Sequence, residues 1–290
     1  MLLIIIIASV VASMFNGLST LLQRLATGTP DKSKLFKLRF VVDVTKHPLF
    51  LIGLLFQVTA AGIHLFALSK GSLLLVQPLL TLDLVFLFLI LHFKYHLQTG
   101  KKEWLAVLAI VIGVGLLFIV SDPQSGHAPY NGFKWLILLS LGVIVSLICV
   151  YITKKSEKAN IRAITAGLAT AISYALNASL AKLTLTILKH HSLLHLFLRW
   201  PVYGLIISAI VSIILMQSAY GSGPLVISQP IMETVTPLLS ALVGLIIFGD
   251  TIRNAPSDIV GELLCSALMV WGIFTLGGSK KLYIKLNNKD

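Results

Sequence analysis

Charged residues are scarce in this sequence. They make up 12% of its 290 residues, whereas 57% are hydrophobic, and the mean hydropathy is +0.93. Soluble domains contain about 25% charged residues, so this composition excludes an ordinary soluble domain and predicts an integral membrane protein. Acidic residues are the rarest charged group, with 11 Asp and Glu against 23 Lys and Arg. Each carboxylate inside an apolar run is therefore a candidate functional residue.

Cysteines are few, and catalytic motifs are missing. Cys149 and Cys265 both lie in apolar runs, where buried thiols are expected rather than a disulfide. The sequence has no nucleotide-binding loop, nucleophile elbow or zinc-protease motif. We therefore expect no enzymatic activity, no cofactor, no resident metal and no nucleic-acid partner. The expected partners are a small-molecule or cation substrate and membrane lipid, and the oligomeric state is left open.

Nine apolar runs are long enough to be membrane-spanning helices, which need about 20 residues each. The first run has no basic segment before it and is too long for a signal peptide, so we expect an uncleaved helix. We therefore predict an all-α polytopic membrane protein. The runs cover residues 1–22, 48–69, 72–93, 104–120, 134–153, 163–188, 201–219, 223–248 and 259–277.

Basic residues outside these runs are distributed unequally between the two faces. The segments 24–47, 94–102 and 154–162 and the tail 280–290 hold 17 Lys and Arg, whereas the loops on the other face hold five. Cytoplasmic loops carry the excess of Lys and Arg. We therefore predict a multi-pass protein of the cell membrane with its N-terminus outside and its C-terminus in the cytoplasm.

The stretch from Gly223 to Gly249 carries a carboxylate, Glu233, near the middle of a spanning run. A charge at the centre of a spanning helix costs at least about 2.5 kcal/mol, so such a residue usually faces protein or water. At helical spacing it shares one face with the polar residues Gln229, Thr236 and Ser240. This stripe predicts the lining of a substrate or ion cavity. The alternative is a polar contact between helices with no transport role.

Two prolines flank Glu233 in the same run. Pro230 cannot donate a hydrogen bond to the carbonyl of Val226, and Pro237 cannot donate to that of Glu233. We therefore predict that both prolines break this helix and free backbone acceptors at membrane depth, as in the broken helices of transporters.

The two halves of the chain share a repeated pattern. Gly71, Gln77 and Pro78 match residues 223, 229 and 230 at a constant offset of 152 residues. The repeat predicts two four-helix units, 1–120 and 159–279, joined by one extra helix in 121–158 and followed by a basic tail, 280–290. Because one helix separates the units, the second enters the membrane inverted relative to the first.

The first half supplies the counterpart of the Glu233 stripe. Gln77 and Thr81 match Gln229 and Glu233, and Pro78 is expected to break this helix as well. Asp83 is a secondary acidic candidate because it lies two residues after Thr81, about 200° around a continuous helix, so the two should not face the same cavity. A structural hydrogen bond or ion pair is the alternative role for Asp83.

Four further polar residues lie near mid-membrane. Asn16 and Asn177 occupy corresponding helices and are candidates for substrate contact or for interhelical hydrogen bonds, and Gln57 and His64 are cavity candidates on the second helix. Lys182 lies less than two turns from the end of its run, so we expect it to extend outward to the membrane surface.

The paired segments ALSKGSLLLVQPLLTLDLVF and SAYGSGPLVISQPIMETVTPLLSALVGLIIFGD resemble the drug/metabolite transporter superfamily, whose EamA-type exporters are the usual examples. The resemblance covers nearly the whole chain, and the nine-span layout is similar to the branch of the NIPA-type magnesium transporters. It implies a substrate path between the halves and alternating access. The first half departs from the EamA pattern because it lacks the acidic residue that Asp250 supplies after Gly249, and we assign Asp250 no role.

We therefore interpret the chain as a secondary transporter of a small solute, such as a metabolite, amine or drug-like cation, and we expect transport to be coupled to protons. A lone mid-membrane carboxylate suits a proton carrier that binds a cationic or zwitterionic solute. The alternatives are a transporter of magnesium or another divalent cation, for which one carboxylate is few ligands, and a membrane subunit without transport activity.

Overall fold

The chain folds into a bundle of helices in the computed structural model. The structure describes residues 2–27, 45–96, 99–121, 123–124, 126, 130–190, 196–223, 225–253 and 256–279. Within these ranges no strand is present, and extended backbone pairs only in an isolated bridge between Gln124 and Thr251. The predicted basic tail, 280–290, lies outside the described residues.

The prediction of nine spanning helices is confirmed for the described residues, in which nine helices are long and apolar enough to cross a membrane. Two of these spans are divided, the third into α4 and α5 and the eighth into α11 and a π-helical turn, η2. The elements are α1 (Leu2–Thr27), α3 (Pro48–Lys70), α4 (Leu73–Leu80), α5 (Leu82–Phe93), α6 (Lys101–Ser121), α7 (Gly132–Lys155), α8 (Ala159–His190), α10 (Trp200–Ser222), α11 (Leu225–Val243), η2 (Gly244–Phe248) and α12 (Pro256–Gly277).

Local sequence signals explain several helix boundaries. Pro48 opens α3, where its missing N–H would have no intrahelical partner in any case. Ser72 caps α4, since its hydroxyl accepts a hydrogen bond from the amide of Leu75 at 3.1 Å. Asn131 caps α7 in the same way through the amide of Lys134, also at 3.1 Å.

The third span contains Pro78, which the sequence singled out as a helix breaker, and it is interrupted three residues later. α4 ends at Leu80 and α5 begins at Leu82, with Thr81 between them. The Thr81 hydroxyl donates to the carbonyl of Pro78 at 2.7 Å, and the Thr81 amide bonds to the same carbonyl at 3.3 Å. Thr81 thereby provides a hydrogen-bond donor for the backbone carbonyl at the break. Such a carbonyl needs a partner from the protein, because no water is available to it inside a membrane.

The eighth span differs from the prediction. α11 continues as a helix through both Pro230 and Pro237, so neither proline breaks it. A proline removes one helical hydrogen bond, and packing against neighbouring helices holds the remaining turns in place. The helix changes geometry later, in the π-helical turn η2, which ends at Gly249 in the left-handed conformation with φ of 67°. This position requires glycine because other residues rarely adopt such a φ.

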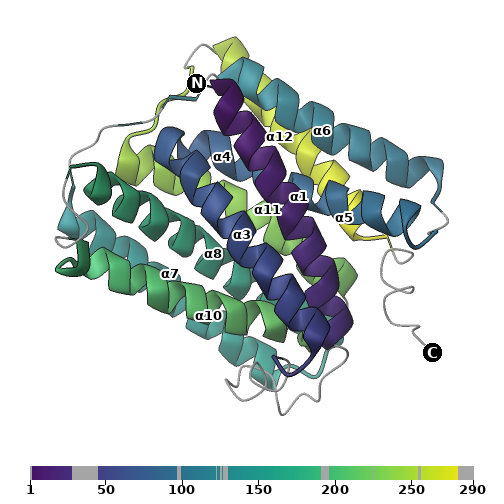
Figure 1. Cartoon of the computed structure of the whole chain (residues 1–290). Coiled ribbons are helices and arrows are strands. Elements are labelled where there is room, and N and C mark those ends of the chain that lie inside the picture. The colour runs from purple at the N-terminus through teal and green to yellow at the C-terminus, as the bar shows by residue number, and fades with distance from the viewer. Residues whose placement is uncertain are drawn as a thin grey trace.

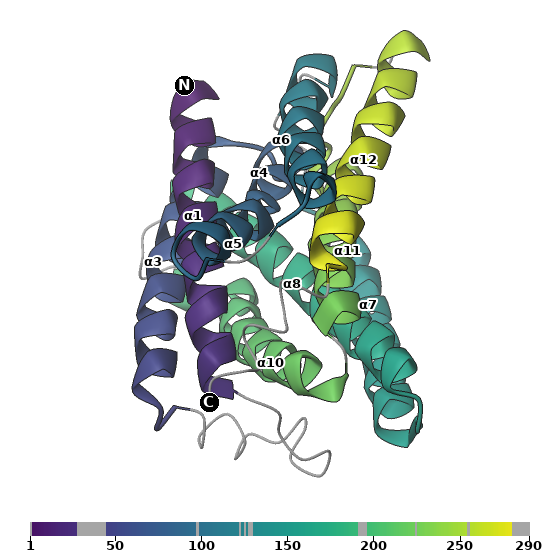
Figure 2. The ribbon, with the colours of Figure 1, turned by 90° about the vertical axis from the view of Figure 1, so that its right-hand side faces the viewer.

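The helices pack in pairs around a central α11. α1 packs on α3, α8 on α10, and α6 on α12, while α7 covers the outer side of α8. Figure 1 shows α1 and α3 side by side, and Figure 2 shows α6 beside α12. α11 contacts α4, α8, α10 and α12, so one face of the helix that carries Glu233 packs inside the bundle, while Leu238 and Leu242 on another face are exposed. We call the side of the bundle on which α1 begins the N-terminal side and the other side the opposite side.

Candidate functional site

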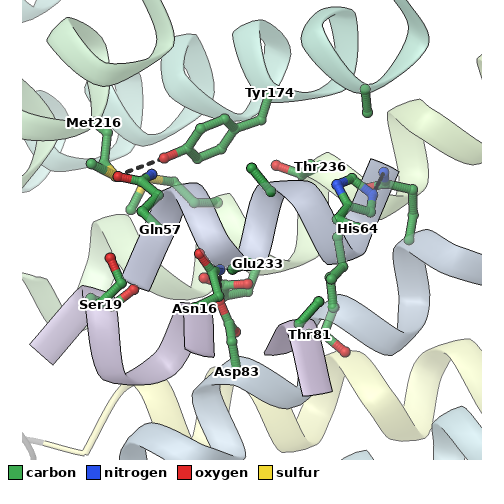
Figure 3. A pocket seen from close by; sticks show the side chains of 18 of the residues that line it. Asn16, Ser19, Gln57, His64, Thr81, Asp83, Tyr174, Met216, Glu233 and Thr236 are labelled. Carbon is green, nitrogen blue, oxygen red and sulfur yellow. Dashed lines mark hydrogen bonds between the residues drawn. The ribbon is translucent and has the colours of Figure 1, made fainter. Parts of the chain in front are cut away.

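A polar cavity of about 200 Å³ lies inside the bundle. Its lining residues come from α1, α3, α4, α5, α8, α10 and α11, together with Thr81 at the break between α4 and α5. Figure 3 shows polar side chains from several of these helices pointing into the same space. Polar groups at membrane depth are costly, so a cavity lined by them is the candidate functional site.

The structure brings together most of the residues that the sequence singled out. Ser240, the last residue of the predicted stripe, is fully buried outside the cavity lining, and Pro78 and Pro230 are buried there as well. Proximity alone does not assign a binding role, so that role stays a prediction. The predicted residues that line the cavity are Asn16, Gln57, His64, Gln77, Thr81, Asp83, Asn177, Gln229, Glu233, Thr236 and Pro237.

Asp83 and Glu233 form the acidic centre of the cavity. Asp83 lies in the first turn of α5 and Glu233 lies on α11, and their carboxyl groups are hydrogen-bonded to each other. Figure 3 shows the two side chains close together beside Asn16. A carboxylate contains only acceptors, so a hydrogen bond between two carboxyl groups requires one proton. Two carboxyl groups this close are not expected to ionise together, so we expect the pair to share one proton and to carry one negative charge.

The sequence predicted that Asp83 and Thr81 would not face the same cavity, and the structure corrects this prediction. Both residues line the cavity. The expectation assumed one continuous helix, in which residues two apart point in different directions. The helix is interrupted at Thr81, so the direction of Asp83 is set by the start of α5 and not by the α4 periodicity.

The acidic pair belongs to a chain of hydrogen bonds that starts and ends on α1. Arg24 donates from its guanidinium to Oε1 of Gln229, and Nε2 of Gln229 donates to Oε1 of Glu233 at 2.7 Å. Asn16 donates from Nδ2 to Oδ2 of Asp83 at 2.8 Å. The order is therefore Arg24, Gln229, Glu233, Asp83 and Asn16. With one proton shared by the pair, the positive charge of Arg24 would balance the remaining negative charge of this network.

Arg24 was not predicted as part of the site. The sequence interpretation placed it in the loop 24–47, whereas α1 continues to Thr27 and the Arg24 side chain is only 6% exposed. Its guanidinium lies 5.0 Å from the centre of the Tyr220 ring, which is favourable for a cation. The signal available in the sequence was a single arginine two residues beyond an apolar run, and this position also fits a surface residue.

A second polar cluster lies next to Arg24 on α1. Gln23 donates from Nε2 to Oε1 of Gln57 at 2.7 Å and to the hydroxyl of Ser19 at 3.0 Å. Gln217 on α10 donates from its own Nε2 to Oε1 of Gln23 at 2.7 Å. These amides connect α1, α3 and α10 on the opposite side of the cavity.

The remaining predicted residues divide between cavity and packing roles. Nε2 of His64 and Nε2 of Gln77 are 3.3 Å apart, so they contact each other in the wall formed by α3 and α4. Asn177 donates to the Ser208 hydroxyl at 2.9 Å and to the Leu205 carbonyl at 3.3 Å, which is the interhelical bonding given as its alternative role. Tyr174 and Met216 were not predicted; the Tyr174 hydroxyl lies 2.7 Å from the Met216 sulfur (Figure 3).

Lys182 and Asp250 lie in a separate polar cluster on the N-terminal side. Lys182 is 8% exposed and donates to the carbonyls of Leu68 and Gly71. We predicted that the Lys182 side chain would extend to the membrane surface. This prediction is wrong, because the carbonyls at the end of α3 bind the side chain inside the protein. Asp250 is also buried, and burial raises the pKa of its carboxyl, while the Gly126 amide and the Lys182 charge act in the opposite direction.

Metal ligands are limited in the part of the chain that the structure describes. There, no group of three or more His, Cys, Asp or Glu residues is arranged to hold a metal ion. Asp83 and Glu233 are two carboxyl groups with amide oxygens nearby, and these are the residues that could bind a cation in the cavity.

Comparison with known proteins leaves the family open. The chain is 28% identical over 233 residues to an uncharacterized protein of Corynebacterium glutamicum, and the match covers 78% of each chain. No protein family description matches the chain, and no solved structure matches it.

Proposed function

We propose that this chain is a secondary transporter that exchanges a small monovalent organic cation for a proton by alternating access. The observation that carries the proposal is the interacting carboxyl pair of Asp83 and Glu233, which lies in a cavity lined by polar side chains among helices able to span a membrane. Ionisable groups at membrane depth typically bind ions or transfer protons. No part of the proposal requires ATP hydrolysis by this chain.

The charge balance of the network defines the exchange. With its shared proton, the pair carries one negative charge that the nearby Arg24 balances. When a monovalent cation enters, the proton leaves the pair to solvent on that side, and the two carboxylates hold the cation. When the cation leaves on the other side, a proton returns to the pair. Both states are neutral overall, which is favourable where charges are poorly solvated.

The cavity volume limits the size of the substrate. About 200 Å³ is smaller than the roughly 300–1,000 Å³ of pockets that hold drug-sized ligands. Tyr174, Tyr220, Met216 and Met232 also line the cavity, and their aromatic and sulfur atoms suit the carbon part of an amine. These features favour a short alkylammonium ion over a large drug-like cation.

The arrangement of helices supports alternating access through two related halves. In the proposed inverted repeat, α1 to α6 form the first unit, α7 is the linking helix and α8 to α12 form the second. The pairs α1 with α3 and α8 with α10 are in contact at corresponding places in the two units. The carboxyl pair joins the units, since Asp83 belongs to the first and Glu233 to the second. The resemblance to the drug/metabolite transporter superfamily implies the same organisation.

A divalent cation is the second candidate substrate. The structure adds Asp83 to Glu233, so the cavity offers two carboxyl groups instead of the one expected, with oxygens of Asn16 and Gln229 nearby. Mg²⁺ prefers such oxygen ligands and completes its six positions with water. However, a divalent ion with two carboxylates and Arg24 would leave one uncompensated positive charge in the cavity, so we place this candidate second.

Flux through liposomes containing only the purified protein tests the proposal. Vesicles carry a pH-sensitive dye, and methylammonium or Mg²⁺ is added outside in separate experiments. We expect methylammonium to drive proton efflux at a rate that saturates with its concentration and exceeds the leak of protein-free vesicles. Flux with Mg²⁺ alone would support the second candidate. Absence of flux with every small cation would support a membrane subunit without transport activity.

A further inference from the structure

The junction between α3 and α4 contains two sets of backbone groups that a helix cannot satisfy by itself. α3 ends at Lys70 with carbonyls that lack intrahelical donors, and α4 begins at Leu73 with amides that lack intrahelical acceptors. The junction is buried, since Gly71 and Ser72 are both buried. Unsatisfied backbone groups are costly in such a place, so their partners determine how firmly the junction is held.

Both sets of partners come from distant parts of the chain. Lys182 on α8 donates from Nζ to the carbonyl of Leu68 at 3.1 Å and also to that of Gly71. Asp250, which follows η2, lies near the start of α4, where the amides of Leu73 and Leu74 favour its charged form. A cation therefore binds the negative end of α3, and an anion lies at the positive end of α4.

The two partners also interact with each other and with a loop. Lys182 and Asp250 attract each other electrostatically, and their exposed fractions are only 8% and 4%. Oδ1 of Asp250 accepts a hydrogen bond from the amide of Gly126 at 2.8 Å. Removing one member of such a buried pair leaves the other without its compensating charge.

We propose that Lys182 and Asp250 form a latch that closes the cavity on the N-terminal side by fixing the junction of α3 and α4 to α8 and η2. The proposal rests on the proposed transport function, because alternating access requires this side to open and close. Opening separates α3 and α4 from α8 and η2, so the two side chains release the backbone groups in that step. Lys182 and Asp250 are thus positioning residues and do not contact the substrate.

The position of the latch relative to the cavity supports this role. Ala178 lines the cavity and lies one helical turn from Lys182 on α8. Gln77, also in the lining, lies one turn after the first residues of α4, near which Asp250 lies. The latch is therefore located directly between the cavity and the N-terminal end of the bundle.

The accessibility of a cysteine in the cavity tests the latch. We would replace Cys149 and Cys265, which form no disulfide, by alanine and introduce Ala178→Cys as the reporter. A membrane-impermeant methanethiosulfonate reagent is applied to intact cells and to inside-out vesicles, so that each side is probed separately. We expect Lys182→Met and Asp250→Asn each to raise the labelling rate from the N-terminal side by about tenfold, a usual size for coupling between conformational states.

Two further variants separate the latch from general loosening of the fold. Gly244→Ala places a methyl group 2.6 Å from Oδ2 of Asp250, so it displaces this carboxylate without removing a charge and should also raise the labelling rate. Lys189→Met removes an exposed charge from the same helix as Lys182 and should leave the rate unchanged. Thermal unfolding confirms which variants are folded.

The outcomes distinguish the latch from the proposed function. Unchanged labelling in Asp250→Asn and Gly244→Ala protein that is folded overturns the latch, even when the wild-type protein transports methylammonium. Increased labelling in a protein that transports no cation supports the latch and contradicts the transport proposal. Increased labelling from both sides in Lys189→Met as well as in Lys182→Met shows loosening of the bundle and also overturns the latch.

Discussion

The carboxyl groups of Asp83 and Glu233 are hydrogen-bonded to each other although the two residues are 150 positions apart in the chain. This contact needs a proton between them. It also depends on both helices, since Asp83 lies in the first turn of α5 after the break at Thr81 and Glu233 lies on the uninterrupted α11. A change at either residue should therefore affect the function of both.

The first prediction concerns the shared proton. Glu233→Gln and Asp83→Asn should each reduce cation-driven proton flux to the level of protein-free liposomes, because an amide cannot release a proton in exchange for a cation. The amide that Glu233→Gln introduces can still accept from Gln229 and donate to Asp83, so we expect the thermal unfolding temperature of this variant to stay close to that of the wild type. Flux measured with the pH-sensitive dye gives the answer.

The matched control is Thr234→Val, which changes a hydroxyl on α11 outside the cavity lining. That hydroxyl is buried and has no hydrogen-bond partner among the described residues, so its loss should leave the flux unchanged. Glu233→Gln protein that transports at the wild-type rate with the same pH dependence would show that the pair is not the coupling site. The double variant should cost no more flux than either single one, because both remove the same proton.

The second prediction concerns the close approach of α1 to α5. A Cβ atom at Gly17 would lie 2.6 Å from the carbonyl oxygen of Asp83 and 3.2 Å from the amide nitrogen of Leu87, so one helix must shift. We expect Gly17→Ala to destabilise the protein by about 1–3 kcal/mol, as for overpacking elsewhere. Because the shift moves Asp83, flux should fall as well.

Gly115→Ala is the control for this substitution. A Cβ atom there meets nothing within 4 Å, and alanine favours a helix by up to about 1 kcal/mol relative to glycine. Chemical denaturation in detergent micelles compares the two variants. Equal stability of Gly17→Ala and Gly115→Ala would contradict the tight packing between α1 and α5.

The sequence predicted the helices much better than the contacts between them. The apolar runs 48–69 and 134–153, for example, correspond to α3 and α7 within two residues at each end. Length and hydropathy determine such boundaries, because a bilayer requires a minimum apolar length and excludes unsatisfied backbone. The polar face of α11 was also predicted, since 3.6-residue periodicity places Gln229, Glu233 and Thr236 on one side of it.

The rest of the candidate site could not be predicted, because it depends on where the helices end and on which helices contact one another. Arg24 became part of the site because α1 extends to Thr27 and packs near α11, and no local pattern specifies either fact. Asp83 entered the cavity because the helix breaks at Thr81. Pro230 and Pro237 were assigned a break from local chemistry, whereas packing against neighbouring helices keeps α11 continuous.

The third prediction is the orientation of the bundle. The unequal distribution of basic residues predicts that the N-terminal side faces the outside of the cell. In a cysteine-free background, Tyr130→Cys should react with an impermeant reagent on intact cells, and Lys158→Cys should react only in inside-out vesicles; both side chains are exposed. The reverse pattern would invert the orientation and leave the fold and the cavity as described.

The fourth prediction concerns Arg24. Arg24→Lys keeps the charge but loses the planar fork that bonds Gln229 over the Tyr220 ring, so we expect partial loss of flux. Arg24→Met also removes the charge that balances the carboxyl pair, so it should abolish exchange with monovalent cations. Parallel flux assays of the two variants test this order. Equal flux in wild-type and Arg24→Met protein would show that the charge of Arg24 takes no part.

The last prediction follows from the charge balance and distinguishes the two candidate substrates. One proton released for each monovalent cation bound leaves the net charge carried across the membrane at zero. Methylammonium exchange should therefore proceed at the same rate whether or not a potassium diffusion potential is imposed on the liposomes. Exchange of one divalent cation for one proton would instead move one net charge in each cycle.

A membrane potential of 100 mV changes the free energy of moving one elementary charge across the membrane by about 2.3 kcal/mol. This energy corresponds to about a fiftyfold change in the accumulation ratio, since each 1.4 kcal/mol is a factor of ten. Accumulation of methylammonium is thus expected to follow the pH difference alone, and a potential of either sign should leave it unchanged. A fiftyfold response to 100 mV would mean that the pair does not exchange its proton for a single positive charge, and the divalent cation would become the preferred substrate.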